Sequence, residues 1–287
     1  MKGLAVKSTG SVFHLKKTIG RGGFGTVYLA ELMGEGGFSK SVALKILNPD
    51  VEEVSEIGCR FRDEARVLGL VRHRSIVHVE GLLRVQGRWA LVMEYVEGRD
   101  VKQLMDPQQT GNMVAIPVGP ALEIAGEVAE ALAVAYVFPS PDGGMLNLLH
   151  RDIKPSNIQV TAVGEVKVLD FGIARADFDA REAETRMFAF GSGGYMAPER
   201  HRMVDCHAGD VYSLGVVLWE ILVGGRFGRT SPLEVPHNSK VLWAMDKLYA
   251  QVRDEQLVRF VGQMLSFEPT TRPDAREVES WCWETLR

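Results

Sequence analysis

The chain has 287 residues, of which 46% are hydrophobic, so it can bury one large core or two smaller ones. Its 33 basic and 37 acidic residues leave a formal net charge of −4, which provides no basic field for a nucleic-acid partner. No run of about 18 apolar residues occurs, and the opening MKGLAVKSTG lacks the apolar core of a signal peptide, so neither a membrane span nor secretion is expected.

The first third of the chain is predicted to form mainly β-strands. The expected strands are residues 11–19, 26–32, 41–47 and 88–96, which alternate in polarity or are rich in β-branched and aromatic residues. One helix is expected at residues 58–71, because four apolar side chains recur there at helical spacing. They are Phe61, Ala65, Leu68 and Val71.

The rest of the chain is predicted to be mainly helical. Residues 119–138 form a long apolar pattern with Pro120 near its start, and residues 209–224 are apolar almost all round, which indicates a buried helix. The tail, residues 241–283, is expected to form helices interrupted at prolines. Exposed loops are expected at residues 33–40 and 139–147, where glycine, serine and proline gather. The overall prediction is an α+β chain with a smaller strand-rich part followed by a larger helical part.

A glycine-rich stretch follows the first of these strands, with Gly20, Gly22 and Gly25 in a G-x-G-x-x-G pattern. A dinucleotide-binding fingerprint has the same spacing but needs a helix after the loop, and here a β-branched strand follows. A plain turn between two strands explains the glycines taken alone. The alternative is a loop whose backbone N–H groups approach phosphate oxygens closely.

Lys45 decides in favour of a phosphate, because it stands within the apolar strand VALKIL. Burying an ammonium group is costly unless it meets an anion. Glu64 on the following helix is the expected carboxylate partner, since it lies closer to the apolar stripe than Asp63. A solvated helix charge is the competing interpretation of Glu64.

The stretch HRDIKPSN, residues 150–157, gathers an acid, an ammonium and an amide in one loop at Asp152, Lys154 and Asn157. Phosphoryl transfer needs an acceptor for the hydroxyl proton, a cation for the moving phosphate and oxygen ligands for magnesium. Asp170 then ends an apolar strand, where a carboxylate suits a hard metal ion. Asp170 alone would more often mark a turn, but beside this loop a metal ligand is favoured.

These motifs resemble the catalytic domain of eukaryotic-type (Hanks-type) Ser/Thr protein kinases, in the bacterial branch. The likeness covers residues 13–286 and includes, in the family's order, the glycine loop, VALK, HRDIKPSN, DFG and GYMAPER. It implies a bilobal fold with a β-rich N-lobe at 13–93, a hinge at 94–97 and a helical C-lobe at 98–287. It also implies ATP as phosphate donor and Mg²⁺ as the metal, with Mn²⁺ as an alternative.

The resemblance gives each catalytic residue a role. Asp152 would orient and deprotonate the substrate hydroxyl, and Lys154 would contact the γ-phosphate. Lys45 would bind the α- and β-phosphates while paired with Glu64.

Other residues would bind the metal or support the scaffold. Asn157 and Asp170 would hold Mg²⁺. Glu199 and Arg272 would form a buried structural ion pair, and Asp210 would brace the catalytic loop.

The nucleotide would lie against glycine-loop and strand residues. Met93 would guard the back of the adenine pocket, and the backbone of Glu94 and Val96 would bind the adenine edge. Gln159 departs from the family, which usually has an apolar residue under the adenine there. Its amide could weaken nucleotide binding, or it could fold away to a partner. The full expected set is Gly20, Gly22, Gly25, Val27, Ala43, Lys45, Met93, Glu94, Val96 and Gln159.

Regulation is expected between residues 172 and 197. Arg151, just before Asp152, is typical of kinases that a phosphate in this segment can switch, and Thr185 is the candidate site. Permanent negative charge from Glu182 and Glu184 is the alternative. Ser192 replaces the usual threonine, and its hydroxyl is expected to keep the bonds to the catalytic loop.

The predicted function is transfer of the ATP γ-phosphate to Ser/Thr hydroxyls of protein substrates. Autophosphorylation is expected between residues 172 and 197. A pseudokinase scaffold and a small-molecule kinase are the alternatives. A homodimer is an option from resemblance alone, whereas neither nucleic acid nor a membrane is an expected partner. The cysteines Cys59, Cys206 and Cys282 are expected as free buried thiols in a reducing cytoplasm.

Overall fold

The structure, a computed structural model, forms two compact units. The described residues are 5–8, 11–22, 25–49, 55–139, 143–171 and 192–287. The first unit holds the described residues up to Glu97, and the second holds those from Gly98 onward. Within the described part of the chain, no helix combines the length and apolar character that a membrane span requires.

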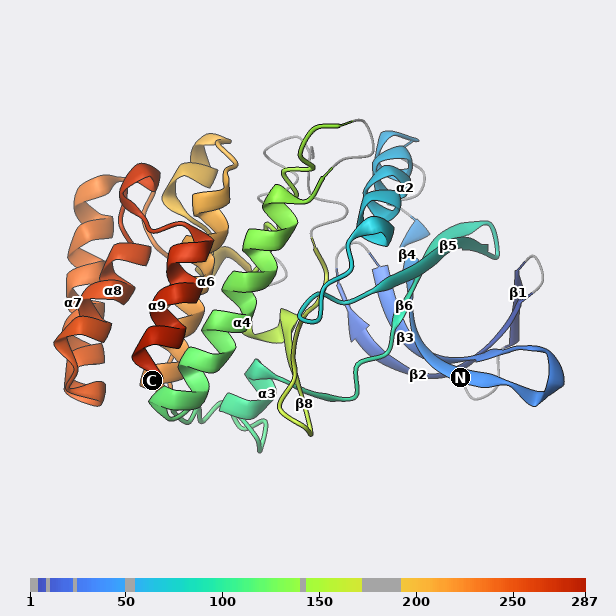
Figure 1. The fold of residues 1–287 in the computed structure, drawn as a ribbon, viewed down its shortest axis with the longest axis horizontal. Coiled ribbons are helices and arrows are strands. Elements are labelled where there is room, and N and C mark those ends of the chain that lie inside the picture. The colour runs from blue at the N-terminus through green and yellow to red at the C-terminus, as the bar shows by residue number, and fades with distance from the viewer. Residues whose placement is uncertain (1–4, 9–10, 23–24, 50–54, 140–142, 172–191) are drawn as a thin grey trace. The chain divides into compact units, whose positions relative to one another are not determined.

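The first unit is built on a six-stranded antiparallel sheet with strand order β1-β2-β3-β4-β6-β5 (Figure 1). The strands are β1 (Ala5–Ser8), β2 (Ser11–Arg21), β3 (Gly25–Met33), β4 (Ser39–Leu47), β5 (Val79–Val85) and β6 (Arg88–Glu94). A short 3-10 turn, η1 (Glu35–Gly37), joins β3 to β4 in the exposed loop that the sequence predicts. The four strands expected from the sequence are therefore confirmed.

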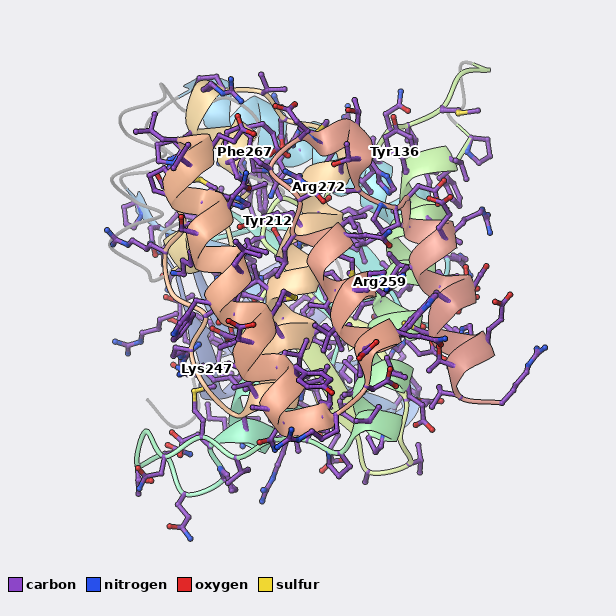
Figure 2. All side chains as sticks on the ribbon, turned by 90° about the vertical axis from the view of Figure 1, so that its left-hand side faces the viewer. Tyr136, Tyr212, Lys247, Arg259, Phe267 and Arg272 are labelled. Carbon is purple, nitrogen blue, oxygen red and sulfur yellow. The ribbon has the colours of Figure 1, made fainter. Side chains whose placement is uncertain are left out.

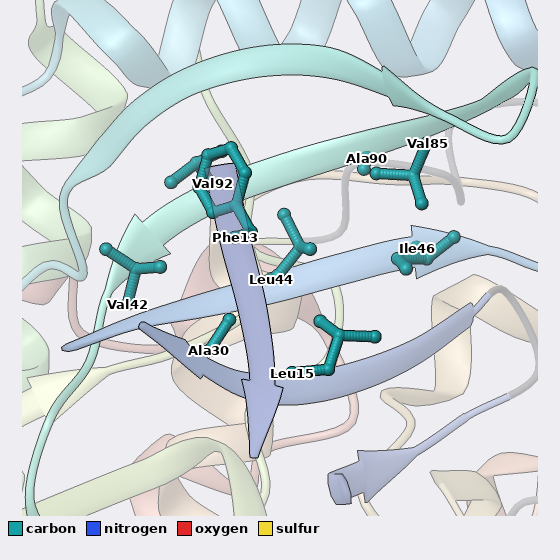
Figure 3. Close-up of a cluster of buried hydrophobic side chains, with 9 residues drawn as sticks. All are labelled: Phe13, Leu15, Ala30, Val42, Leu44, Ile46, Val85, Ala90 and Val92. Atoms are coloured by element: carbon teal, nitrogen blue, oxygen red, sulfur yellow. The ribbon is translucent and has the colours of Figure 1, made fainter. Parts of the chain in front are cut away.

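A cluster of buried apolar side chains forms the core of this sheet (Figure 3). Its members are Phe13, Leu15, Ala30, Val42, Leu44, Ile46, Val85, Ala90 and Val92. They fall on one face because strand side chains alternate, as Val42, Leu44 and Ile46 do along β4. The edge strands β1 and β5 contact each other, so the sheet curls around this cluster.

Helix α2 (Ser55–Leu70) contacts β5 and covers part of the first unit (Figure 1). Phe61, Ala65 and Leu68 are buried, and so is Val71 just past the helix end. The apolar stripe predicted from the sequence is confirmed.

The second unit consists mainly of helices around a buried central one. The longer helices are α4 (Val118–Val137), α6 (His207–Val223), α7 (Glu234–Val252), α8 (Glu255–Met264) and α9 (Ala275–Thr285). Residues 209–222 of α6 are all buried, which confirms the expected core helix. Helix α6 contacts α4, α7 and α8, and α4 lies alongside α9 (Figure 1).

Short elements complete the second unit. They are β7 (Gly98–Asp100), α3 (Val101–Met105), β8 (Ile158–Thr161), β9 (Val166–Val168) and the 3-10 turns η2 (Pro155–Asn157), η3 (Ser192–Gly194), η4 (Pro198–Arg202) and η5 (Pro269–Thr271). Strands β7, β8 and β9 form a small antiparallel sheet that places η2 directly before β8. In the loop after α4, Pro139 pairs with Met145 in an isolated bridge.

The cysteine expectation holds in part. Cys282 is buried, and burial raises the pKa of its thiol to about 12. Cys206 is only half-buried, so the expectation of a buried thiol is wrong there, because this residue immediately precedes α6 at the end of a loop. The side chain of Cys59 lies outside the described residues.

Candidate active site

The loop between α4 and β8 brings three of the predicted residues into contact. Lys154 Nζ lies 2.8 Å from Asp152 Oδ2, and Asn157 Nδ2 donates to the same oxygen at 3.1 Å. Asn157 Nδ2 also donates to the backbone oxygen of Asp152 at 2.9 Å. Pro155 begins the turn η2, which brings Asn157 back toward Asp152. The Asp152 carboxylate therefore lies beside an ammonium group and an amide donor, as the sequence predicts.

Asn157 also ties this loop to the end of β9. Its backbone N–H donates to Lys154 O at 2.9 Å, and its backbone oxygen accepts from Leu169 N at 2.8 Å. Asp170 follows Leu169 with φ of 53°, in the left-handed region that side-chain-bearing residues seldom adopt. The two predicted metal ligands thus lie on segments joined by a direct backbone hydrogen bond.

Asp210 on α6 holds the start of the loop at residues 150–157, the expected catalytic loop. Its carboxylate accepts hydrogen bonds from His150 N at 2.7 Å and Arg151 N at 2.8 Å. His150 is fully buried, and its Nε2 lies 2.8 Å from the backbone oxygen of Leu169. Arg151 has φ of 64°, so the two bonds to Asp210 hold a backbone conformation that is unfavourable by itself. The expected bracing role of Asp210 is confirmed.

The charge of Asp210 is stabilised inside the protein. Burial alone would raise the pKa of its carboxyl, but Arg200 and His150 outweigh burial and hold the pKa below its usual value. Because the pKa is lower in the folded chain, ionised Asp210 stabilises the fold at neutral pH. That contribution is lost as the pH falls through the acidic range. Burial conversely lowers the pKa of His150, despite the nearby carboxylates.

Arg200 and Asp205 extend this bracing outward, and sequence reasoning did not find them. Arg200 Nη2 donates to Asp210 Oδ1 at 2.8 Å, while Arg200 Nε donates to Asp205 Oδ1 at 3.0 Å. The other oxygen of Asp205 accepts from Arg151 Nε. Arg200 directly follows the APE motif, which was the available signal, but nothing in the sequence pairs it with these acids.

Glu199 and Arg272 form the expected buried ion pair. Arg272 Nη1 and Nη2 contact the two carboxylate oxygens of Glu199 at 2.7 and 2.8 Å. Arg272 also donates to three backbone oxygens, those of Ser266, Ala208 and Phe267. Figure 2 shows Arg272 close to Tyr212 and Phe267, and its guanidinium carbon lies 4.8 Å from the Tyr212 ring centre. This pair fixes η4 to the segment before α9.

A second buried acid anchors Tyr195, and sequence reasoning also missed it. Tyr195 Oη donates to Glu220 Oε2 at 2.7 Å and accepts from Arg226 Nη1 at 2.7 Å. Phe227 N donates to the other Glu220 oxygen at 2.9 Å. Burial raises the pKa of the Glu220 carboxyl, although these donors oppose that effect. The GYMAPER segment is therefore fixed to the core helix α6.

In the first unit, strand register places several predicted nucleotide residues on one face of the sheet. Lys45 is opposite Val27 on β3, and Ala43 is opposite Met93 on β6. Directly opposed residues share a face, and these positions alternate with the core positions of β4. Lys45 therefore points to the face opposite the apolar cluster, together with Val27, Ala43 and Met93.

Gly25 is required by close packing of two strands. A Cβ atom at this position would lie 2.4 Å from the backbone oxygen of Ile46. We expect Gly25→Ala to destabilise the first unit by about 1–3 kcal/mol, because a strand would have to move. Chemical unfolding would measure this effect. Gly81→Ala, where no atom lies within 4 Å of the added Cβ, should change stability by no more than about 0.5 kcal/mol. Equal stability of the two variants would contradict the prediction.

The structure describes some of the remaining predicted residues and not others. Thr185 lies outside the described residues, as do the side chains of Glu64 and Ser192. Gln159 lies on β8 opposite Asp100 and Lys167 in the small sheet of the second unit.

Comparison with known proteins decides the family. The sequence profile of the protein kinase domain matches residues 13–283. The chain belongs to the protein kinase family. Its fold is the protein kinase fold, and a protein kinase domain uses ATP as its phosphate donor and acts on proteins.

Bacterial kinases are among the relatives of this chain. The tyrosine-protein kinase MasK of Myxococcus xanthus is 37% identical over 282 residues, covering 96% of this chain and 43% of the relative. The serine/threonine-protein kinase PknB of Mycobacterium leprae is 35% identical, covering 78% of this chain and 35% of the relative. The chain thus spans less than half the length of these two curated relatives. The PknI kinase domain of Mycobacterium tuberculosis superposes with a TM-score of 0.72 at 26% identity, covering 99% and 98% of the two chains.

Proposed function

We propose that this chain is an active kinase that transfers the γ-phosphate of ATP to serine and threonine hydroxyls of proteins. The contact of Lys154 and Asn157 with the Asp152 carboxylate carries the proposal, because it joins a proton acceptor to a cation and an amide. Catalysis of phosphoryl transfer depends on such positioning and charge neutralisation. A pseudokinase scaffold is less favoured, since every catalytic position carries the expected residue type.

In the proposed reaction, Asp152 orients the substrate hydroxyl and accepts its proton. The hydroxyl oxygen forms a bond to the γ-phosphorus, the bond from that phosphorus to the β–γ bridging oxygen breaks, and ADP leaves. Lys154 offers its ammonium group to the transferring phosphoryl group. The 2.8 Å contact of Lys154 Nζ with Asp152 Oδ2 supports this assignment, because it places the cation beside the proton acceptor.

The donor chemistry of Asn157 and Asp170 fits a hard divalent cation. Asn157 Nδ2 is engaged with Asp152, so the side-chain oxygen is the atom available to a cation. Within the described residues, no group of three or more His, Cys, Asp or Glu side chains is placed to hold a metal. Mg²⁺ needs fewer protein ligands, because it takes one or two carboxylates together with phosphates and waters. A bound Mg²⁺, or Mn²⁺ in its place, would neutralise charge on the phosphates.

The first unit is proposed to bind the nucleotide. Lys45 would hold the α- and β-phosphates with Glu64 as its partner, and the glycine loop would cover the phosphates. Glu94 is held by two hydrogen bonds with the backbone of His78, one from His78 N to Glu94 Oε1 at 2.8 Å and one from Glu94 N to His78 O at 2.9 Å. This fixation suits a residue whose backbone would bind the adenine edge. Gln159 is proposed to weaken nucleotide binding relative to an apolar residue.

Serine and threonine are favoured as acceptors, with tyrosine as the second candidate. Relatives named serine/threonine-protein kinases and the Lys154 position favour the aliphatic hydroxyls. The name of MasK, which matches nearly the whole chain, favours tyrosine. Autophosphorylation at Thr185, a homodimer and a cytoplasmic location, where ATP is abundant, are also proposed.

The test is a phosphotransfer assay with radiolabelled ATP, Mg²⁺ and a generic protein acceptor. We expect label on the acceptor from the wild-type chain, loss of that label with a chelator, and very little label from Lys45→Met. Phosphoamino-acid analysis should find phosphoserine and phosphothreonine. Phosphotyrosine alone would move the chain to the tyrosine class, and no transfer by the folded wild type would favour the scaffold.

A further inference from the structure

Four charged side chains form a continuous chain with alternating sign in the second unit. Arg151 contacts Asp205, Asp205 contacts Arg200, and Arg200 contacts Asp210. Asp210 in turn accepts the backbone N–H groups of His150 and Arg151. The path begins at the Arg151 side chain and ends at the Arg151 backbone N–H. These contacts therefore form a closed ring that includes the residue directly before Asp152.

Burial increases along this path from Asp205 toward Asp210. The side chains of Arg200 and Asp210 are 8% and 1% exposed, whereas that of Asp205 is 36% exposed. Arg200 packs closely against Gly209, where an added Cβ would lie 3.0 Å from Arg200 Nε. Because Arg200 is nearly buried and paired with Asp210, Asp205 links the Arg151 side chain to a group inside the protein.

Resting on the proposed function, we propose that Asp205 is a positioning residue for phosphoryl transfer. Its carboxylate bridges the Arg151 and Arg200 guanidinium groups and holds the unfavourable backbone of Arg151 in place, which sets the position of Asp152. Asp205 acts through Arg151 and does not contact the reacting atoms.

Asp205 also supplies a negative charge beside Arg151 from within the chain. A phosphate on a neighbouring segment would act on an arginine in the same way, by forming charge-assisted hydrogen bonds. The catalytic loop therefore has its anionic partner before any modification, and phosphatase-treated chain is expected to keep its activity.

The test compares Asp205→Asn with Asp246→Asn, since each replaces one carboxylate by an amide of the same shape. Asp246 is exposed on α7, and no ion pair to it is found among the described residues. Asp205→Asn should lower kcat roughly tenfold and leave KM for ATP within about twofold. The variant displaces the catalytic loop but leaves nucleotide binding unchanged. Asp205→Glu, which keeps the charge, should recover most of the loss, and Asp246→Asn should match wild type.

A double variant separates positioning from general stabilisation. The double variant Arg151→Gln with Asp205→Asn should lose no more activity than Arg151→Gln alone. Arg151→Gln already breaks the ion pair between Arg151 and Asp205, so the second substitution removes nothing further from it. Additive losses, an unchanged kcat in Asp205→Asn, or inactivity of the phosphatase-treated wild type would each overturn the proposal.

A readout independent of catalysis keeps the two proposals apart. Amide hydrogen exchange at His150 and Arg151 should accelerate in Asp205→Asn and stay unchanged in Asp246→Asn. If the wild type transfers no phosphate yet shows this coupling, the proposed function fails and the positioning role stands. Unchanged exchange in Asp205→Asn refutes the positioning role whatever the activity.

Discussion

Asp152→Asn is expected to lower kcat roughly 10²–10⁴-fold while KM for ATP stays within about twofold. The amide keeps the shape of the side chain, and its oxygen can still accept from Asn157 Nδ2, which now lies 3.1 Å from Asp152 Oδ2. It cannot accept the proton of the substrate hydroxyl, and it loses the charge that attracts Lys154. The loss should therefore fall on the chemical step.

Steady-state kinetics at saturating protein acceptor would measure this loss, with thermal unfolding as a check that the variant folds. Asp246→Asn is the matched control and should match wild type in both measurements. A kcat for Asp152→Asn within tenfold of wild type would show that another group receives the proton. A rise in KM for ATP with kcat preserved would place Asp152 in nucleotide binding instead.

Much of the local structure could be predicted because it follows from short-range patterns. The alternation of Val42, Leu44 and Ile46 fixes which face of β4 enters the core, and therefore also the face on which Lys45 lies. The uniformly apolar residues of α6 predict its burial for a similar reason. The contact of Asp152, Lys154 and Asn157 was also predictable, since only five positions separate the first of them from the last.

The ion pairs and hydrogen bonds that support the catalytic loop and the GYMAPER segment could not be predicted. The residues that form them are distant in sequence, and by residue type they look like ordinary surface charges. Asp205 pairs with Arg151 across 54 positions, and Arg272 pairs with Glu199 across 73. Resemblance to a family supplied the second pair but not the first. Tyr195, Glu220 and Arg226 likewise meet only through the packing of a loop on α6.

The Gln159 departure and the intact catalytic loop can be reconciled. Gln159 lies on β8 immediately after η2, yet η2 and the bonds of Asn157 keep the geometry expected of a working loop. The amide at this position is proposed to affect how tightly the nucleotide binds, whereas the proposed chemical step uses Asp152 and its neighbours. A change in affinity therefore does not require a loss of phosphoryl transfer.

Arg272→Met is expected to lower the free energy of unfolding by about 3–5 kcal/mol, the largest stability effect predicted for this chain. The variant leaves the Glu199 carboxylate buried without its cation, since Glu199 is 3% exposed and contacts Arg272 through both oxygens. It also leaves the backbone oxygens of Ser266, Ala208 and Phe267 without the donors that Arg272 supplies. Urea unfolding of the whole chain would measure this loss of stability.

The controls distinguish an unpaired buried charge from lost side-chain volume. Arg276→Met makes the same replacement at an exposed site on α9, where no ion pair is found among the described residues, and should change stability by no more than about 0.5 kcal/mol. The double variant Glu199→Gln with Arg272→Met should be more stable than Arg272→Met alone, because no uncompensated carboxylate remains. If the double variant is the less stable of the two, the cost lies in the lost hydrogen bonds and packing of Arg272 rather than in the stranded charge of Glu199.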